Sequence, residues 1–156
     1  MKKKKKVPFP QADNLETIYS LFFEIGPDGL TKDDVVGKYG LDTDRQGDYY
    51  LNALMYIGLV EKFGIRFFLN TKGAKLRLES SNNIRNLFCE AVLEHDFLGP
   101  VYSESRKIGA SERRSYVAGR IFNEYGLAHS TSERRATSIC SWFDWIDSNR
   151  GKDSYE

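Results

Sequence analysis

The sequence predicts a mainly α-helical protein that carries one small β-hairpin. Apolar residues recur at intervals of three and four through most of the chain, which is the spacing of helices with one buried face. Glycines follow several of these segments at the position where helices usually end. Two short strand-like runs, joined at Gly64, form the one segment that departs from this pattern.

Composition limits the class of protein. The chain has 156 residues, of which 40% are hydrophobic and 13% aromatic, enough to build the core of one ordinary domain or two very small ones. No stretch approaches the roughly 18 apolar residues of a membrane span, and no apolar signal segment follows the basic N-terminus. Two cysteines do not make a disulfide framework. We therefore expect a cytoplasmic protein with reduced thiols and no membrane partner.

The formal net charge of +1 argues against a bulk nucleic-acid binder, so any such surface must come from local clusters. Arg113-Arg114 and Arg134-Arg135 are two of these. The run Lys2–Lys6 leads to the expectation of a basic flexible tail over residues 1–12. This tail is either a solvated arm or an arm that lies on phosphates.

Residues 13–79 are expected to form a first domain. Its predicted elements are helices over residues 14–25, 31–40 and 43–57, a hairpin over 60–69 and a short helix over 74–78. Asp13 or Asn14 is expected to cap the first helix and Thr31 the second. The order helix, helix, helix, hairpin is that of a winged helix, whose three helices have the arrangement of helix-turn-helix proteins.

Residues 80–148 are expected to form a second, winged-helix-like helix-turn-helix domain. A polar linker over 80–83 precedes a helix over 84–93, and a looser stretch over 94–110 follows it. Ser111 is expected to cap a helix that ends at residue 125, and Ser130 or Thr131 to cap the last helix, which ends near residue 147. No hairpin is expected after it, and residues 149–156 form a polar C-terminal end.

An internal repeat supports two related halves. Tyr39-Gly40-Leu41 recurs as Tyr125-Gly126-Leu127, and Leu54 and Tyr56 then align with Phe143 and Trp145. The alternative is that any two amphipathic helices can be matched in this way. We favour a duplication, hence a mainly α fold with a small β wing and a tandem winged-helix or helix-turn-helix repeat, in which Trp145 packs against the other half.

In a helix-turn-helix protein the first turn of the last core helix enters the major groove. Arginine can hydrogen-bond guanine through two contacts, glutamine can do so with adenine, and short hydroxyls suit phosphates. The DNA-contacting residues predicted on this basis are Thr43, Arg45, Gln46 and Tyr49 in the first half, Thr131, Ser132, Arg134 and Arg135 in the second, and Lys62 and Arg66 on the wing.

Three alternatives stay open for these residues. Arg45 and Arg134 could instead pair with Asp48 and Glu133 on a solvated face. Gln46 could be a buried polar bridge between helices. The wing cations could serve solubility alone.

No catalytic site is predicted. The two histidines and two cysteines lack the spacing of a zinc site, and neither a phosphate-cradling glycine loop nor the acidic ligand set of a metal-dependent nuclease is present. We expect no cofactor, no metal and no catalytic residue in this chain.

Several motifs together resemble a known module. They are residues 7–13, Arg45-Gln46 with Tyr49-Tyr50, Ile57-Gly58-Leu59, residues 69–73, and Arg134-Arg135 followed by residues 141–146. This pattern is similar to the winged-helix module found beside nuclease domains in Type II restriction endonucleases and nicking endonucleases. The resemblance implies that the chain recognises double-stranded DNA in a sequence-specific manner, while a fused or separate nuclease domain cuts it. A winged-helix transcriptional regulator and a protein-interaction module that does not bind DNA are the rival interpretations.

Overall fold

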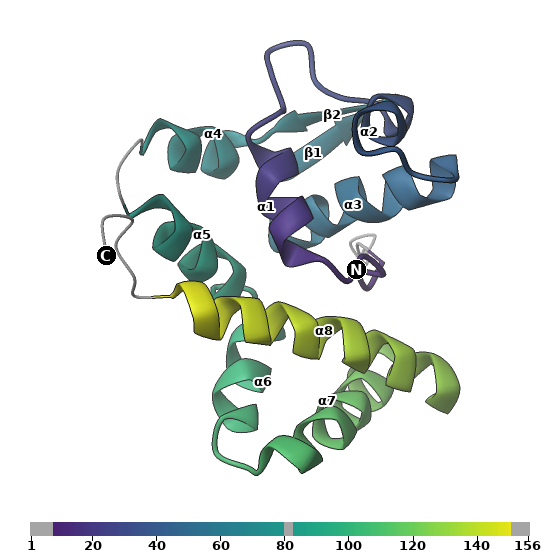
Figure 1. The fold of residues 1–156 in the computed structure, drawn as a ribbon, viewed down its shortest axis with the longest axis vertical. Helices are drawn as coiled ribbons and strands as arrows, with labels where there is room; N and C mark the ends of the chain where they lie inside the picture. The colour runs from purple at the N-terminus through teal and green to yellow at the C-terminus, as the bar shows by residue number, and fades with distance from the viewer. Residues whose placement is uncertain (1–7, 80–82, 151–156) are drawn as a thin grey trace, which may run out of the picture.

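The computed structural model describes residues 8–79 and 83–150. These residues form eight helices and one two-stranded sheet (Figure 1), which confirms the mainly α class with a small β wing. In chain order the elements are α1 (Leu15–Phe22), α2 (Lys32–Tyr39), α3 (Asp44–Ile57), β1 (Val60–Phe63), β2 (Arg66–Leu69), α4 (Thr71–Leu78), α5 (Ile84–Leu93), α6 (Leu98–Ser105), α7 (Ala110–Tyr125) and α8 (His129–Asn149).

Local signals account for the helix boundaries of the first half. The side chain of Asn14 accepts the N–H of Thr17 and so caps α1. Thr31 begins α2 with a reciprocal capping box that it shares with Asp34. Gly40 ends α2 in the left-handed conformation, with φ 62°. The helix α4 begins at Thr71, three residues earlier than predicted, because Asn70 caps it.

The wing is an antiparallel hairpin in which Val60 pairs with Leu69 and Phe63 with Arg66. Leu30, in the connection between α1 and α2, adds an isolated bridge to Phe67 of β2. Phe67 is buried, so this bridge holds the hairpin against the helical core. The first half therefore has the element order of a winged helix, with a short strand-like contact before α2.

The second half contains a helix where the sequence predicts only a loose stretch. Gly99-Pro100 favoured a loop, but both residues lie in the first turn of α6, where a proline costs no hydrogen bond. The Nδ1 atom of His95 accepts the N–H groups of Phe97 (3.0 Å) and Leu98 (3.4 Å). This side chain takes the place of the usual capping residue and lets α6 begin.

The predicted caps of the last two helices are wrong. Gly109 and Ala128 have extended ψ angles of 149° and 155°, so α7 begins at Ala110 and α8 at His129. The predicted caps Ser111, Ser130 and Thr131 therefore lie inside the first turns. In the described part of the chain no strand follows α8.

One continuous hydrophobic core joins the two halves. The helix α8 runs across the molecule and contacts α1, α5 and α7 (Figure 1). Trp145 of α8 packs against Tyr19 of α1 in the other half, as the repeat predicted, and against Phe88 of α5 in its own half. An ion pair of 2.9 Å between Arg85 and Glu16 also links the halves.

The expectation of a flexible tail as far as residue 12 is wrong for residues 8–12. Phe9 is only 7% exposed, and its ring makes edge-to-face contacts with Tyr56, Phe97 and Tyr125. The indole N–H of Trp142 donates to the backbone oxygen of Ala12 at 2.9 Å. The segment is ordered because it fills the seam between the halves. Lys2–Lys6, residues 80–82 of the predicted linker and residues 151–156 lie outside the described residues.

Candidate nucleic-acid interface

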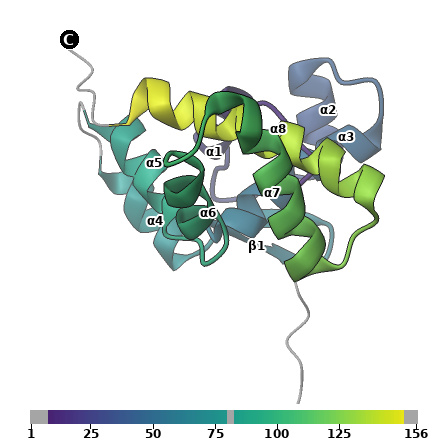
Figure 2. The same ribbon diagram turned by 90° about the horizontal axis from the view of Figure 1, so that it is seen from below.

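The first turns of α3 and α8 lie on the same side of the molecule. Both helices begin at the right-hand side in Figure 1 and again in Figure 2, which is turned by 90°. Each helix follows a Tyr-Gly-Leu motif whose glycine, Gly40 or Gly126, ends the preceding helix with a positive φ. A left-handed glycine therefore ends the helix that precedes each of these two turns.

Arg45 and Arg134 are both exposed in these turns. Among the described residues neither forms an ion pair, so the alternative pairing with Asp48 and Glu133 is absent. The guanidinium of Arg134 makes one long contact, 3.4 Å, to the hydroxyl of Thr131. Both arginines are thus free to reach an outside acceptor.

Gln46 and Thr43 are used to build the turn itself. The side-chain oxygen of Gln46 accepts the N–H of Asp42 at 2.8 Å, and the hydroxyl of Thr43 accepts the N–H of Gln46 at 3.3 Å. Gln46 is half-buried. A two-contact readout of adenine by Gln46 would have to break the first bond, so its role in the turn agrees better with a polar bridge than with base reading.

Two predicted contacts of the second turn are corrected. Ser132 is 1% exposed, and its hydroxyl donates to the backbone oxygen of Leu127, so it does not reach the surface. Arg135 is half-buried and donates to the side-chain oxygen of Gln11 at 2.9 Å. Burial, followed by the neighbouring Arg134, lowers the pKa of this guanidinium. Arg135 therefore ties α8 to the N-terminal segment.

Only the start of α3 is open to a large partner. Tyr49 is half-buried, and Ala53 and Tyr56, further along the same side of the helix, are buried. Phe9 and Tyr125 cover this part, and the hydroxyls of Tyr56 and Tyr125 are 2.6 Å apart. A groove of a nucleic acid could therefore receive the first two turns of α3 but not the whole helix.

Carboxylates surround the first turn of α3. Asp42 and Asp44 are exposed on either side of Thr43, and Asp48 is half-buried one turn into α3. The pKa of Asp33 is raised by a side-chain hydrogen bond to Asp44 and by the charge of that carboxylate. This local negative charge repels an approaching phosphate, so a nucleic acid would be contacted here by the Arg45 side chain alone.

The wing cations are held along the two strands. The ammonium of Lys62 lies 5.2 Å from the centre of the Phe67 ring, and Arg66 donates to the backbone oxygen of Asp28 at 3.2 Å. Between them, Phe63 and Ile65 are strongly exposed. The sequence analysis missed these two apolar residues, although the run Lys-Phe-Gly-Ile-Arg contained the signal.

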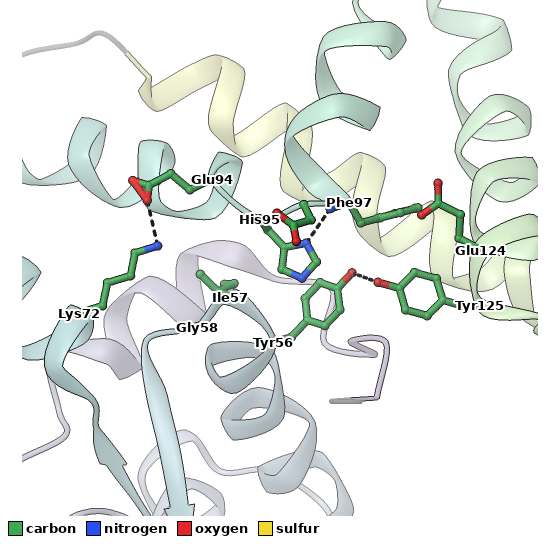
Figure 3. Close-up of a pocket in the computed structure, with 10 residues that line it drawn as sticks. Tyr56, Ile57, Gly58, Lys72, Glu94, His95, Phe97, Glu124 and Tyr125 are labelled. Carbon is green, nitrogen blue, oxygen red and sulfur yellow. Dashed lines mark hydrogen bonds and ion pairs between the residues drawn. The ribbon is translucent and has the colours of Figure 1, made fainter. Parts of the chain in front are cut away.

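A pocket of about 570 Å³ at the seam between the halves was also not predicted (Figure 3). The ring of His95 stacks on that of Tyr56 with centres 4.1 Å apart, and the Lys72–Glu94 ion pair of 3.0 Å spans one edge. Burial lowers the pKa of His95 and raises that of Tyr56. Because Nδ1 of His95 accepts backbone N–H groups, the proton of the neutral ring is on Nε2, and the pocket offers neutral hydrogen-bond donors.

Cys89, on α5, is not among the residues that line this pocket. Burial raises the pKa of the Cys89 thiol to about 12, which keeps this buried cysteine protonated. Within residues 8–79 and 83–150 no group of histidine, cysteine and carboxylate side chains could hold a metal ion.

Comparison with known proteins adds the family. A family model described as "Domain of unknown function (DUF7226)" matches residues 17–150. The chain belongs to the DUF7226 family. No curated protein and no solved structure matches it. The DUF7226 match begins within α1 and extends past α8, so it includes the first turns of α3 and α8, the wing and the seam pocket. In the described part of the chain no helix has the length and apolar character to cross a membrane.

Proposed function

We propose that this DUF7226 protein binds double-stranded DNA in a sequence-specific manner through the first turns of α3 and α8. The observation that supports this most is the placement of Arg45 and Arg134. Both are exposed, neither has an ion-pair partner among the described residues, and their turns lie on one side of the molecule (Figure 1).

The chemistry of each turn suits a base edge better than a continuous phosphate track. A guanidinium can donate two hydrogen bonds to the O6 and N7 atoms of guanine. The carboxylates beside Arg45 discourage phosphates, and Arg134 has Thr131 as a near neighbour that can donate to one. Lys62 and Arg66 on the wing supply further positive charge.

The wider role rests on the motif resemblance. We propose that the chain is the DNA-recognition module of a restriction or nicking endonuclease and works with a nuclease domain that is fused or separate. Such a role belongs in the cytoplasm, in agreement with the two free cysteines. A transcriptional regulator would bind DNA through the same surface, and the chemistry of the two turns does not distinguish these roles.

A selection from randomised duplexes at physiological salt, with unrelated DNA as competitor, tests the proposal. We expect one preferred sequence. With about 4 to 8 phosphate contacts, log K should fall with log salt at a slope of roughly −4 to −7. Deletion of Lys2–Lys6 should reduce this slope without changing the preferred sequence. A flat salt dependence, or no enriched sequence, would count against DNA recognition.

Arginine substitutions then test the two turns. Arg45→Ala should relax the preference at one part of the site and Arg134→Ala at another, because each good two-contact pair contributes about 1–3 kcal/mol of discrimination. Lys75→Ala is the matched control, since Lys75 is exposed on α4 and has no ion pair among the described residues. If both arginine variants fold normally and bind every duplex as the wild type does, these turns do not read DNA and a protein-interaction role becomes the better explanation.

A further inference from the structure

The tip of the wing has an unusual composition for a solvent-exposed hairpin. Lys62, Phe63, Gly64, Ile65 and Arg66 follow one another, so two apolar side chains flank the turn glycine and two cations flank the apolar pair. Phe63 is 62% exposed and Ile65 74% exposed. Gly64 has φ 64°, which gives the tight turn that presents both side chains at the end of the hairpin.

The core does not explain these two apolar side chains. Successive residues of a strand point to opposite faces, so Val60 and Phe67 lie on the buried face, and Phe63 lies on the other. On that outer face the ring of Phe63 makes an edge contact with Phe68, with ring centres 6.0 Å apart, and 62% of Phe63 still remains exposed. Transfer of such side chains from water is favourable, so an exposed apolar tip indicates a partner surface.

The cations set the chemistry of that partner. Lys62 rests over the Phe67 ring and Arg66 is hydrogen-bonded to the backbone of Asp28, so one positive charge is held on each strand behind the apolar tip. A surface that receives the tip must therefore carry negative charge on both sides of an apolar interior. The minor groove of DNA has this arrangement, with phosphates along both rims and stacked bases between them.

We propose that the wing tip is an apolar wedge that enters the minor groove and kinks the duplex. Phe63 and Ile65 would separate one base step, while Lys62 and Arg66 contact the phosphates on either side. The hairpin lies alongside α3 (Figure 1), so one duplex could contact both the wedge and the first turn of α3. The inference rests on the proposed function but goes beyond it, because base reading by α3 and α8 requires no deformation of the DNA.

The bend is measured by energy transfer between dyes at the two ends of a 30-base-pair duplex of mixed sequence with one central TA step, a step that kinks easily. The full chain should shorten the end-to-end distance, as expected for a kink of about 20–90°. Phe63→Ser/Ile65→Ser should bind the same duplex with an unchanged salt slope, since no charge is removed, and leave it straight. Phe23→Ser is the control, because Phe23 is an exposed phenylalanine at the end of α1.

Each outcome separates the wedge from the proposed function. Salt-dependent binding by the wild type without a bend, or an equal bend by the double variant, overturns the wedge and leaves sequence recognition standing. Failure of the wild type to bind any duplex overturns both. If the double variant bends DNA as the wild type does, and the wild type but not the double variant self-associates in sedimentation or binds anionic lipid vesicles, the tip is a protein or membrane contact and the wedge is wrong.

Discussion

Replacement of Phe9 by alanine should strongly destabilise the protein, although this residue precedes the first helix. Its side chain is 93% buried, and its ring centre lies 4.9 to 5.7 Å from those of Tyr56, Phe97 and Tyr125. Burial of an aromatic side chain removes about 150 Å² or more from water, which at about 25 cal/mol per Å² amounts to about 4 kcal/mol. Phenylalanine-to-alanine changes in cores cost about 3–5 kcal/mol, in agreement with this value.

Urea and thermal denaturation would measure the loss. For a chain of this size about 3–5 kcal/mol corresponds to a fall in Tm of roughly 6–20 °C. Phe9→Leu should cost less than about 1.5 kcal/mol because it keeps most of the apolar volume, and Pro8→Ala, at an exposed position, should stay within about 0.5 kcal/mol. Circular dichroism and tryptophan emission should give one coincident transition. A Phe9→Ala loss below about 1 kcal/mol would refute the packing of this segment in the seam.

Three further outcomes follow from single contacts. Gly73→Ala should lower the free energy of unfolding, measured by urea denaturation, by about 1–3 kcal/mol, because the added Cβ would lie 2.1 Å from the backbone oxygen of Leu59. Gly37→Ala is the control, since it has open space on α2 and should be neutral or stabilising. Equal effects of the two substitutions would contradict this reasoning. Burial lowers the pKa of His95, so below about pH 6.5 the unfolded state binds more protons than the folded state, and the free energy of unfolding should fall as the pH drops through this value. His95→Gln should remove this part of the pH dependence of stability. The same pH dependence in both proteins would argue against it. Asp44→Asn should tighten DNA binding about twofold at low salt, because it removes a negative charge from the first turn of α3, next to Arg45. Titration of a labelled duplex would measure this, and unchanged or weaker binding would contradict the reasoning.

Local sequence information predicted most of the helices and the hairpin. Apolar spacing and capping residues act over three or four positions, so the roles of Thr31, Gly40 and Gly126 at helix ends follow from their immediate neighbours in the chain. The same reasoning failed for α6, because the side chain that caps it is His95, which is not a usual capping residue. It also placed the start of α8 too late, since serines and threonines within the helix resembled caps.

The sequence alone determined the fold class, the hairpin, every helix except α6, and the presence of Arg45 and Arg134 near the starts of α3 and α8. Tertiary structure alone decided which neighbours of those arginines remain accessible: Ser132 turns inward, and Arg135 reaches Gln11, which is 124 residues away in the chain. It also decided that Phe9 belongs to the core. The physical reason is that periodicity records which face of an element is apolar but not which distant segment covers it, and that depends on how the two halves pack together.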